Sequence, residues 1–209
     1  MALSFRIAEW TAWPTDDIAL PMSLRRRASP VGQRALKTAL SVLPADSAPR
    51  YVLSSRHGEI GRTTALLTAL AEEGAVSPAE FSMAVHHGLA GLLSIHTGSK
   101  EGHTAIAAGP DSFAYGLIEA ATTLAESGKP VLHLHFEEPL PEIYAPVAGD
   151  PEEDTVLALL LDPAAGVPYS LDPAAEEGAA ASLAAEFAAF LQSNAREGGA
   201  GRWRWSRHD

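Results

Sequence analysis

The stretch VLHLHF at residues 131–136 places bulky side chains on both faces of an extended chain. Side chains alternate between the two faces of a strand, so bulky residues at every position are typical of a strand that is covered on both sides. We therefore expect this segment at the centre of a sheet with helices on both faces, and the neighbouring segments can be placed around it.

The segments before this strand alternate between strand and helix patterns. Short apolar or alternating runs predict strands, and apolar residues at helical spacing predict helices. Ser77, Pro78 and Glu80 form a strong helix entrance, and Gly74, Gly98 and Gly128 each follow the last residue of a predicted helix. The predicted strands are residues 3–10, 51–53 and 103–107, and the predicted helices are residues 30–43, 62–73, 77–97 and 111–127.

The segments after it continue the alternation. Residues 137–154 are rich in proline and acidic residues and predict an extended connection; an apolar strand follows at 156–161. Residues 179–195 form an alanine-rich helix, and residues 202–207 alternate with period two, which predicts a last strand with Trp203 and Trp205 on one face. Strands that alternate with helices indicate a layered α/β fold with one dominant sheet. We expect a single domain, with residues 1–136 as its core and residues 137–209 as a connection followed by a strand–helix–strand extension.

Composition excludes several classes of function. The chain has no cysteine, so thiolate ligands, disulfides and a cysteine nucleophile are excluded. A net charge of −11 opposes binding to nucleic acid, because the phosphate backbone would be repelled. No apolar run reaches the ~20 residues that span a bilayer, and the N-terminus lacks a secretory pattern, so we expect a cytoplasmic protein that is not an integral membrane protein.

Residues 77–131 resemble the nucleophile region of the β-ketoacyl synthases, the condensing enzymes of the thiolase fold. The spacing of the matching features holds without insertion over this segment. These features are Ser77-Pro78, Ala90-Gly91, Gly98, Ile106-Ala107-Ala108-Gly109, Ala120-Ala121 and Val131.

The chain is most similar to the short chain length factors of aryl polyene and related type II polyketide-like pathways. The resemblance implies a thiolase-like fold, truncated to roughly the N-terminal half of a ketoacyl synthase. The segments that carry it are Ser55-Arg56-His57-Gly58-Glu59, Phe81-Ser82, His86-His87-Gly88, Thr104-Ala105-Ile106, Asp111-Ser112-Phe113 and the Trp-rich tail.

The resemblance also implies that the family's chemistry is lost. In active members the strand ends in an Ala-Cys step, and the cysteine opens the next helix, where free N–H groups stabilise a thiolate and an oxyanion. That register falls here on Pro110, which has neither a nucleophile nor an N–H group. A slip of one or two residues would substitute Gly109, Asp111 or Ser112, and never a thiol.

Active synthases are about twice as long, and their second half supplies two histidines and a lysine that drive decarboxylation. Nothing after Val131 resembles those motifs, so both the nucleophile and the base are missing. We therefore expect a catalytically silent homologue with no cofactor and no bound metal.

Such a subunit would pair with a full-length, cysteine-bearing β-ketoacyl synthase. In this family the strand before the nucleophile pairs across the dimer, which points here to residues 103–107. Residues 56–59 and the helix at 77–97 would lie against the partner's acyl tunnel, where bulky side chains limit chain growth sterically. The residues expected at the interface or tunnel are His57, Phe81, Met83, His87, His103, Thr104, Ile106 and Phe113.

Several alternatives stay open from the sequence. Arg25, Arg26 and Arg27 form a basic cluster that is either a solvated loop or a docking site for an acyl carrier protein. His133 and His135 share one side of a strand, as zinc ligands can, although a packed or hydrogen-bonded pair is the simpler interpretation. Asp111 and Ser112 are interpreted as helix caps.

Two other functions compete with the partner subunit. One is a stand-alone acyl-transfer or decarboxylating enzyme that uses His57 or the pair His86 and His87. The other is a carrier-docking scaffold that has no influence on product length. A half-length thiolase unit should also expose apolar surface, because the full fold packs two similar halves, and such surface normally marks a partner site.

Overall fold

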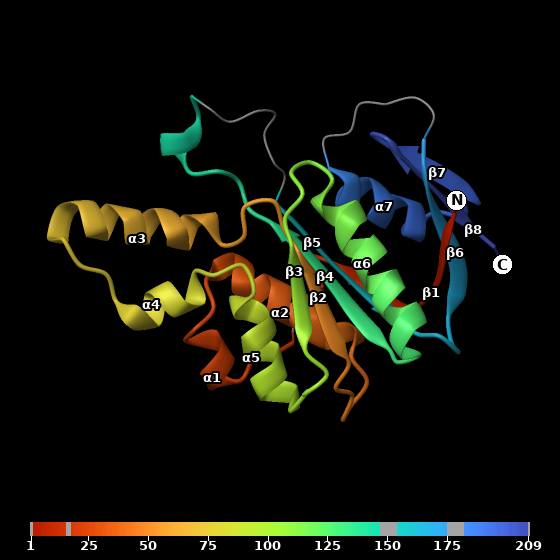
Figure 1. The fold of residues 1–209 in the computed structure, drawn as a ribbon, viewed down its shortest axis with the longest axis horizontal. Helices are drawn as coiled ribbons and strands as arrows, with labels where there is room; N and C mark the ends of the chain where they lie inside the picture. The colour runs from red at the N-terminus through yellow and green to blue at the C-terminus, as the bar shows by residue number, and fades with distance from the viewer. Residues whose placement is uncertain (1, 16–17, 147–153, 175–181, 209) are drawn as a thin grey trace.

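The computed structural model describes residues 2–15, 18–146, 154–174 and 182–208. These residues form one mixed sheet that is flanked by helices (Figure 1). Within these residues the strand order is β3-β2-β4-β5-β1-β6-β8-β7. Strands β2, β3 and β4 are parallel, and every other neighbouring pair is antiparallel. The strands are β1 (Leu3–Ala12), β2 (Arg50–Ser54), β3 (His103–Ile106), β4 (Val131–Glu137), β5 (Thr155–Leu161), β6 (Val167–Pro173), β7 (Glu197–Ala200) and β8 (Trp203–Arg207).

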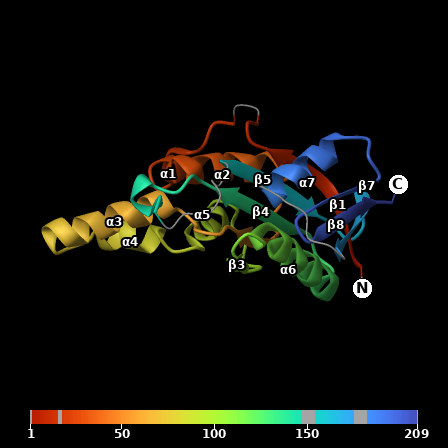
Figure 2. The same ribbon diagram turned by 90° about the horizontal axis from the view of Figure 1, so that it is seen from above.

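Helices cover both faces of this sheet and create two separate hydrophobic cores. On one face α2 (Pro30–Val42) and α5 (Gly88–Thr97) pack against β2, β4 and β5. On the other face α6 (Ser112–Ser127) and α7 (Leu183–Gln192) pack against the sheet, including β1, β6 and β8. Figure 2 shows α2 on one side of the sheet and α6 on the other. The predicted layered α/β architecture is confirmed.

The predicted central strand is β4, and all seven of its side chains are buried. It pairs in parallel with β2 and antiparallel with β5, so it joins the two parts of the sheet. Leu132, Leu134 and Phe136 face the core under α2 and α5, whereas His133 and His135 face α6. One face of β4 is therefore entirely apolar within VLHLHF, whereas the other carries Val131 together with the two histidines.

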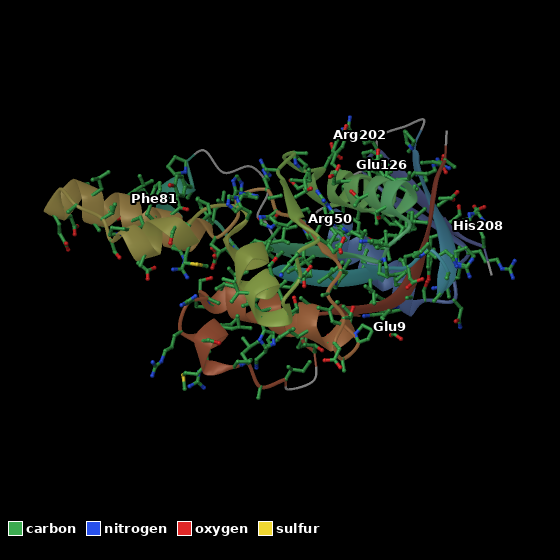
Figure 3. The ribbon with its side chains drawn as sticks, turned by 60° about the horizontal axis from the view of Figure 1, so that its bottom comes forward. Glu9, Arg50, Phe81, Glu126, Arg202 and His208 are labelled. Atoms are coloured by element: carbon green, nitrogen blue, oxygen red, sulfur yellow. The ribbon has the colours of Figure 1, made fainter. Side chains whose placement is uncertain are left out.

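Helices α3 (Ile60–Glu73) and α4 (Pro78–Met83) form an arm that projects away from the sheet (Figures 1 and 3). None of their described side chains is buried. Leu67 is 53% exposed, Leu70 49% and Phe81 62%. The remaining short helices are α1 (Met22–Arg25) and the 3-10 turn Glu142–Tyr144.

The single helix predicted for residues 77–97 is wrong. Ser77 and Pro78 begin α4 as expected, and Ser77 Oγ accepts a hydrogen bond from Glu80 N. The helix then ends at Met83, and α5 begins only at Gly88. A Cβ atom at residue 88 would lie 2.9 Å from the Met83 carbonyl oxygen, so the chain folds back tightly there and glycine permits the break.

Two C-terminal strands were not predicted. Strand β6 contains Pro168 and Pro173, which weaken a strand pattern, and β7 contains two glycines, which carry no side-chain pattern at all. The final strand is confirmed as β8, with Trp203 and Trp205 buried on one face. The start expected near residue 179 for the last helix lies outside the described residues, and the helix ends at Gln192 rather than 195.

The predicted N-terminal core and C-terminal extension share the same sheet. Strand β1 pairs with β5 on one edge and with β6 on the other.

The outward side of α6 is largely polar, because Thr122, Ala125, Glu126 and Ser127 are exposed there. The exposed large apolar residues expected of a half-length unit include Leu67, Leu70 and Phe81 on the arm and Ile95 on α5. In the described part of the chain, every helix is too short or too polar to cross a membrane.

The turn between β5 and β6 provides a test of this packing. Gly166 has a φ of +90°, and a Cβ atom there would lie 2.0 Å from the Ile7 carbonyl oxygen. Gly166→Ala should lower the free energy of unfolding by about 2–5 kcal/mol, through the positive φ and the clash together. Gly74→Ala is the control, because its φ is also positive but no atom lies within 4 Å of the added Cβ. Equal losses in urea unfolding for both variants would contradict the close approach of this turn to β1.

Candidate functional site

Polar side chains gather where β2 and β4 end. Parallel pairing sets Ser54 beside His135, so the two strands finish side by side. His133, His135 and Glu137 lie on one face of β4 because residues two apart share a face. The carboxyl ends of parallel strands are a common place for ligand sites, so this cluster is the first candidate for chemistry.

Ser54 binds both imidazoles of β4. Its Oγ lies 2.8 Å from His133 Nε2 and 2.9 Å from His135 Nδ1. A hydroxyl carries one proton, so Ser54 donates to one ring and accepts from the other. The sequence interpretation of a hydrogen-bonded pair is therefore confirmed, with the serine between the two rings.

Helix α6 seals this network from solvent. Phe113 stacks against His133 and meets His135 edge-on, both at 5.5 Å between ring centroids. Gly116 lies directly over the group, since a Cβ atom there would fall 2.5 Å from His133 Nε2. Ser54 and His133 are both fully buried, so a substrate has no access to this serine.

Burial lowers the pKa of His133 to about 3, and the neighbouring His135 adds to that shift. Burial also lowers the pKa of His135 to about 3. Both imidazoles are therefore neutral at physiological pH. Their ring nitrogens on the Ser54 side are already hydrogen-bonded, and the described residues contain no group of three or more side chains that could hold a metal ion.

The turn at residues 55–59 leads from β2 toward the arm. The Glu137 carboxylate accepts hydrogen bonds from Arg56 N and, at 3.3 Å, from Ser55 Oγ. Ser55 Oγ in turn accepts from Gly58 N at 2.7 Å, and the Ser55 carbonyl oxygen accepts from His86 Nε2 at 2.7 Å. His57 is half-buried on this turn.

The helix start at residues 109–112 differs from the expected pair of caps. Pro110 is exposed, and Gly109 has a φ of +60°. Ser112 Oγ accepts from Ala108 N at 2.9 Å and donates to the Gly109 carbonyl oxygen at 2.7 Å. Asp111 occupies the N-cap position but makes no side-chain cap, so the interpretation of Asp111 as a side-chain cap is wrong.

Asp111 instead binds the C-terminal hairpin. Its Oδ1 accepts a hydrogen bond from Trp203 Nε1 at 2.7 Å, and its Oδ2 lies 2.7 Å from an Arg202 guanidinium nitrogen. Arg202 also lies over the ring of Tyr115, with 5.8 Å between its guanidinium carbon and the ring centroid. Asp111 and Ser112 are thus both engaged in structural contacts.

The residues expected at an interface are only partly brought together. His87 and His103 are exposed and stack at 5.5 Å between ring centroids. Thr104 and Ile106 are half-buried on β3, whose outer edge has no strand partner among the described residues. Burial lowers the pKa of His103, and His87 and Arg50 lower it further.

Phe81, Met83 and Phe113 lie in three different environments. Phe81 is exposed on the arm, and Met83 is half-buried against the core under α2 and α5. Phe113 is 2% exposed and contacts Phe187 inside the other core, so its side chain does not reach the surface. The sequence does not show whether a phenylalanine near the start of a helix faces the core or the solvent.

The basic cluster lies at the base of the arm. Arg25, Arg26 and Arg27 are exposed, and the Arg27 carbonyl oxygen accepts from Arg62 at 2.7 Å. Arg62 also pairs with Glu80 of α4 and lies 3.8 Å from the Glu59 carboxylate.

Burial raises the pKa of Glu59, which accepts a hydrogen bond from Ser29 N. The sequence did not single out Arg62 or Glu137, because isolated charged residues near helix starts and strand ends are usually solvated.

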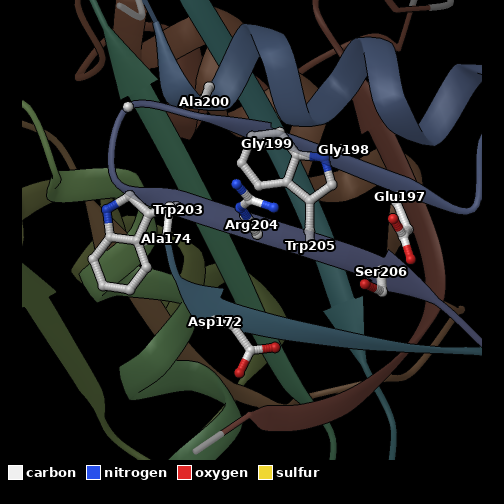
Figure 4. Close-up of a pocket in the computed structure, with 11 residues that line it drawn as sticks. Asp172, Ala174, Glu197, Gly198, Gly199, Ala200, Trp203, Arg204, Trp205 and Ser206 are labelled. Atoms are coloured by element: carbon white, nitrogen blue, oxygen red, sulfur yellow. The ribbon is translucent and has the colours of Figure 1, made fainter. Parts of the chain in front are cut away.

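A separate cavity of about 580 Å³ lies over β6, β7 and β8 (Figure 4). The residues that line it include Asp172, Glu197 and Arg204 together with the largely buried Trp203 and Trp205. None of the interface, carrier-docking or nucleophile-register residues expected from the sequence lines it.

Comparison with known proteins gives one family and several related structures. Residues 8–206 match the family described as "Beta-ketoacyl synthase, N-terminal domain". A structure of a ketosynthase (ApeO) in complex with its chain length factor (ApeC) from Xenorhabdus doucetiae is similar, with a TM-score of 0.83 and 27% identity over 98% of this chain and 100% of the matched chain. No curated protein matches the sequence significantly.

Two more distant structures share the fold. The ishigamide ketosynthase/chain length factor has a TM-score of 0.62 and 15% identity, over 83% of this chain and 68% of that one. A β-ketoacyl synthase from Burkholderia phymatum STM815 has a TM-score of 0.58 and 12% identity, over 78% of this chain. The match spans 52% of that synthase, or about half of its length.

The two neutral histidines make stability depend on pH. Between the ordinary histidine pKa of 6.5 and the folded value of about 3, the unfolded chain binds a proton at each ring that the folded chain does not. The free energy of unfolding should therefore fall as pH is lowered through this window, by up to about 1.4 kcal/mol per pH unit for each histidine. His133→Gln and His135→Asn keep the bond to Ser54, and each should reduce that slope in urea unfolding between pH 6 and 4.5. An unchanged slope in both variants would show that the rings are protonated in the folded chain.

The contact between Asp111 and the hairpin gives a second test. Asp111→Ala leaves the buried Trp203 indole N–H without an acceptor, which should cost about 1–3 kcal/mol of unfolding free energy. Asp111→Asn keeps an acceptor oxygen and should lose less. Chemical unfolding followed by tryptophan fluorescence measures both, and an alanine variant as stable as the wild type would contradict the anchoring role.

Proposed function

The chain belongs to the β-ketoacyl synthase N-terminal domain family, and from this premise we propose that it is a non-catalytic chain length factor. In this role the whole chain acts as one domain, pairs with a full-length β-ketoacyl synthase and shapes that enzyme's acyl tunnel. The pathway class is polyene, polyketide or fatty-acid-like biosynthesis.

The helix start at residues 109–112 supports a non-catalytic role. The sequence contains no cysteine. In the register that the resemblance assigns to the nucleophile stands Pro110, and both neighbouring candidates are occupied: Asp111 pairs with Arg202, and Ser112 bonds to the Gly109 carbonyl. Acyl transfer in the manner of the family needs a nucleophile that this helix start does not offer.

The observation that carries the pairing is the arm of α3 and α4. Leu67, Leu70 and Phe81 are each about half or more exposed on it, while none of the described side chains of either helix is buried. Apolar side chains grouped on an element without a core of its own are typical of a partner surface. The outer edge of β3 pairs with no other strand in the described part of the chain, and such an edge can bind another strand.

The likeness to the Xenorhabdus ketosynthase–chain length factor complex supports the same proposal. That match extends over 98% of this chain and the whole of the matched chain. A partner synthase would supply the nucleophile that this chain lacks.

The proposed mechanism is steric. Side chains of this subunit close the far end of the partner's tunnel, and each methylene forced against a packed wall costs of order 1 kcal/mol. Phe81, Met83 and His57 are the gate candidates, because they lie on the arm or on the turn near its base. Phe113 is buried in this chain's own core and would act only by supporting neighbouring residues.

Arg25, Arg26 and Arg27 are the proposed contact for an acyl carrier protein, because they form an exposed basic group at the base of the arm. The stand-alone enzyme has less support. His86 is bonded to the Ser55 carbonyl oxygen, and His87 stacks on His103.

Pairing through the arm predicts a loss of affinity when a charge is placed on it. The wild-type chain should form a one-to-one complex with the full-length synthase from the same organism. Phe81→Asp should raise the Kd at least about tenfold, because a carboxylate would be desolvated at the centre of an apolar contact. Thr122→Asp on the outer side of α6 is the control and should leave the Kd unchanged. Isothermal titration calorimetry measures both, and equal affinities for the two variants would remove the arm from the interface.

The gate predicts a change in product length. Phe81→Ala, Met83→Ala and His57→Ala each enlarge the proposed tunnel wall, so at least one should shift the products of the reconstituted pair to longer chains. Mass spectrometry of the released acyl chains gives the distribution. Unchanged product length in all three variants would reject the gate while leaving the pairing intact.

A further inference from the structure

A buried carboxylate at the end of β4 holds the turn at residues 55–59. Glu137 is 8% exposed, and its two oxygens accept from Arg56 N and Ser55 Oγ. It is the last residue of β4, where pairing with Thr155 of β5 fixes its backbone. The turn is therefore fastened to the most buried strand of the sheet.

The hydrogen bonds of this group have a fixed direction. A carboxylate accepts only, so Ser55 must donate its single proton to Glu137. The lone pairs of Ser55 Oγ are then free to accept from Gly58 N, which lies 2.7 Å away. Glu137 thus contacts Ser55 and Arg56 directly and Gly58 through Ser55, on both sides of His57 in the sequence.

A second contact holds the turn from the opposite side. His86 Nε2 donates to the Ser55 carbonyl oxygen at 2.7 Å. Gly58 has a φ of +63°, and a Cβ atom there would lie 3.0 Å from His86 Nδ1, so the ring packs directly on the turn. His86 lies between α4 and α5, and the turn is consequently clamped between β4 and the base of the arm.

We infer that Glu137 and Ser55 are positioning residues that set the place of His57 in the tunnel wall, and so help to determine product length. This inference rests on the proposed function. Glu137 and Ser55 do not themselves touch the acyl chain, because both side chains are buried. Product length then depends on a polar contact inside this subunit as well as on the bulk of the gate side chains.

The test compares Glu137→Gln with Glu138→Gln in the complex with the full-length synthase. A carboxamide at 137 can still accept from Arg56 N, but its NH₂ group faces Ser55 and competes with Gly58 N for the Ser55 oxygen. Glu138 accepts from Gly61 N at 2.8 Å, a bond that the carboxamide oxygen of glutamine retains. The measurements are the Kd of the pair, the product-length distribution and the amide hydrogen exchange of Arg56 and Gly58.

The expected result is a shift of the Glu137→Gln products by at least one extension unit, with faster exchange at Arg56 and Gly58 and an unchanged Kd. Glu138→Gln should match the wild type in all three measurements. Ser55→Ala removes the same link without altering the carboxylate, should give the same shift, and decides the matter if Glu137→Gln does not fold.

Normal pairing with unchanged product length in Glu137→Gln and Ser55→Ala would overturn the positioning role and leave the proposed function standing. A wild-type chain that neither binds the synthase nor changes its products would overturn the proposed function itself.

Discussion

Every side chain of β4 is buried, and this burial determines how the polar residues around the strand are paired. The strand lies between β2 and β5, and helices cover both of its faces, so each polar group on it must find a partner inside the protein. Ser54 lies between the two imidazoles, and Glu137 binds the turn that follows β2. The turn near the arm is therefore held by the same buried strand that forms the centre of the sheet.

The start of α6 shows how this chain uses a position of the family scaffold for structural contacts. The helix start that the resemblance assigns to a nucleophile is present, but its Asp111 anchors the C-terminal hairpin through Trp203 and Arg202. Strands β7 and β8 of the hairpin extend one edge of the sheet, α7 packs on the same face as α6, and the outer side of α6 is largely polar. A domain with one sheet can thus bury its own core and leave the arm as its main exposed apolar element.

Much of the fold could be predicted from the sequence because local patterns were strong. The pattern VLHLHF identified the central strand, and Gly74, Gly98 and Gly128 marked helix ends that the structure contains, each with a positive φ. Strand β6 was missed because its prolines weaken the pattern, and the break between α4 and α5 was missed because it depends on a close approach of the chain at Gly88.

The candidate site was predicted less completely, because its contacts join residues far apart in the sequence. His133 and His135 were recognised as a pair, but the pattern could not supply Ser54, which lies on another strand. The partners of Asp111 come from the last hairpin, and the side chain of Phe113 turned out to face inward. Orientation and long-range pairing are set by tertiary packing, which periodicity alone does not encode.

The proposed role of this chain is to pair with a ketosynthase through its arm and its β3 edge. Amide hydrogen exchange of the chain, alone and mixed with the full-length synthase, tests this most directly. Pairing through these elements should give new protection in α3, α4 and β3, with little change in β6, β7 and β8. Protection confined to the C-terminal strands, or no protection anywhere, would contradict it.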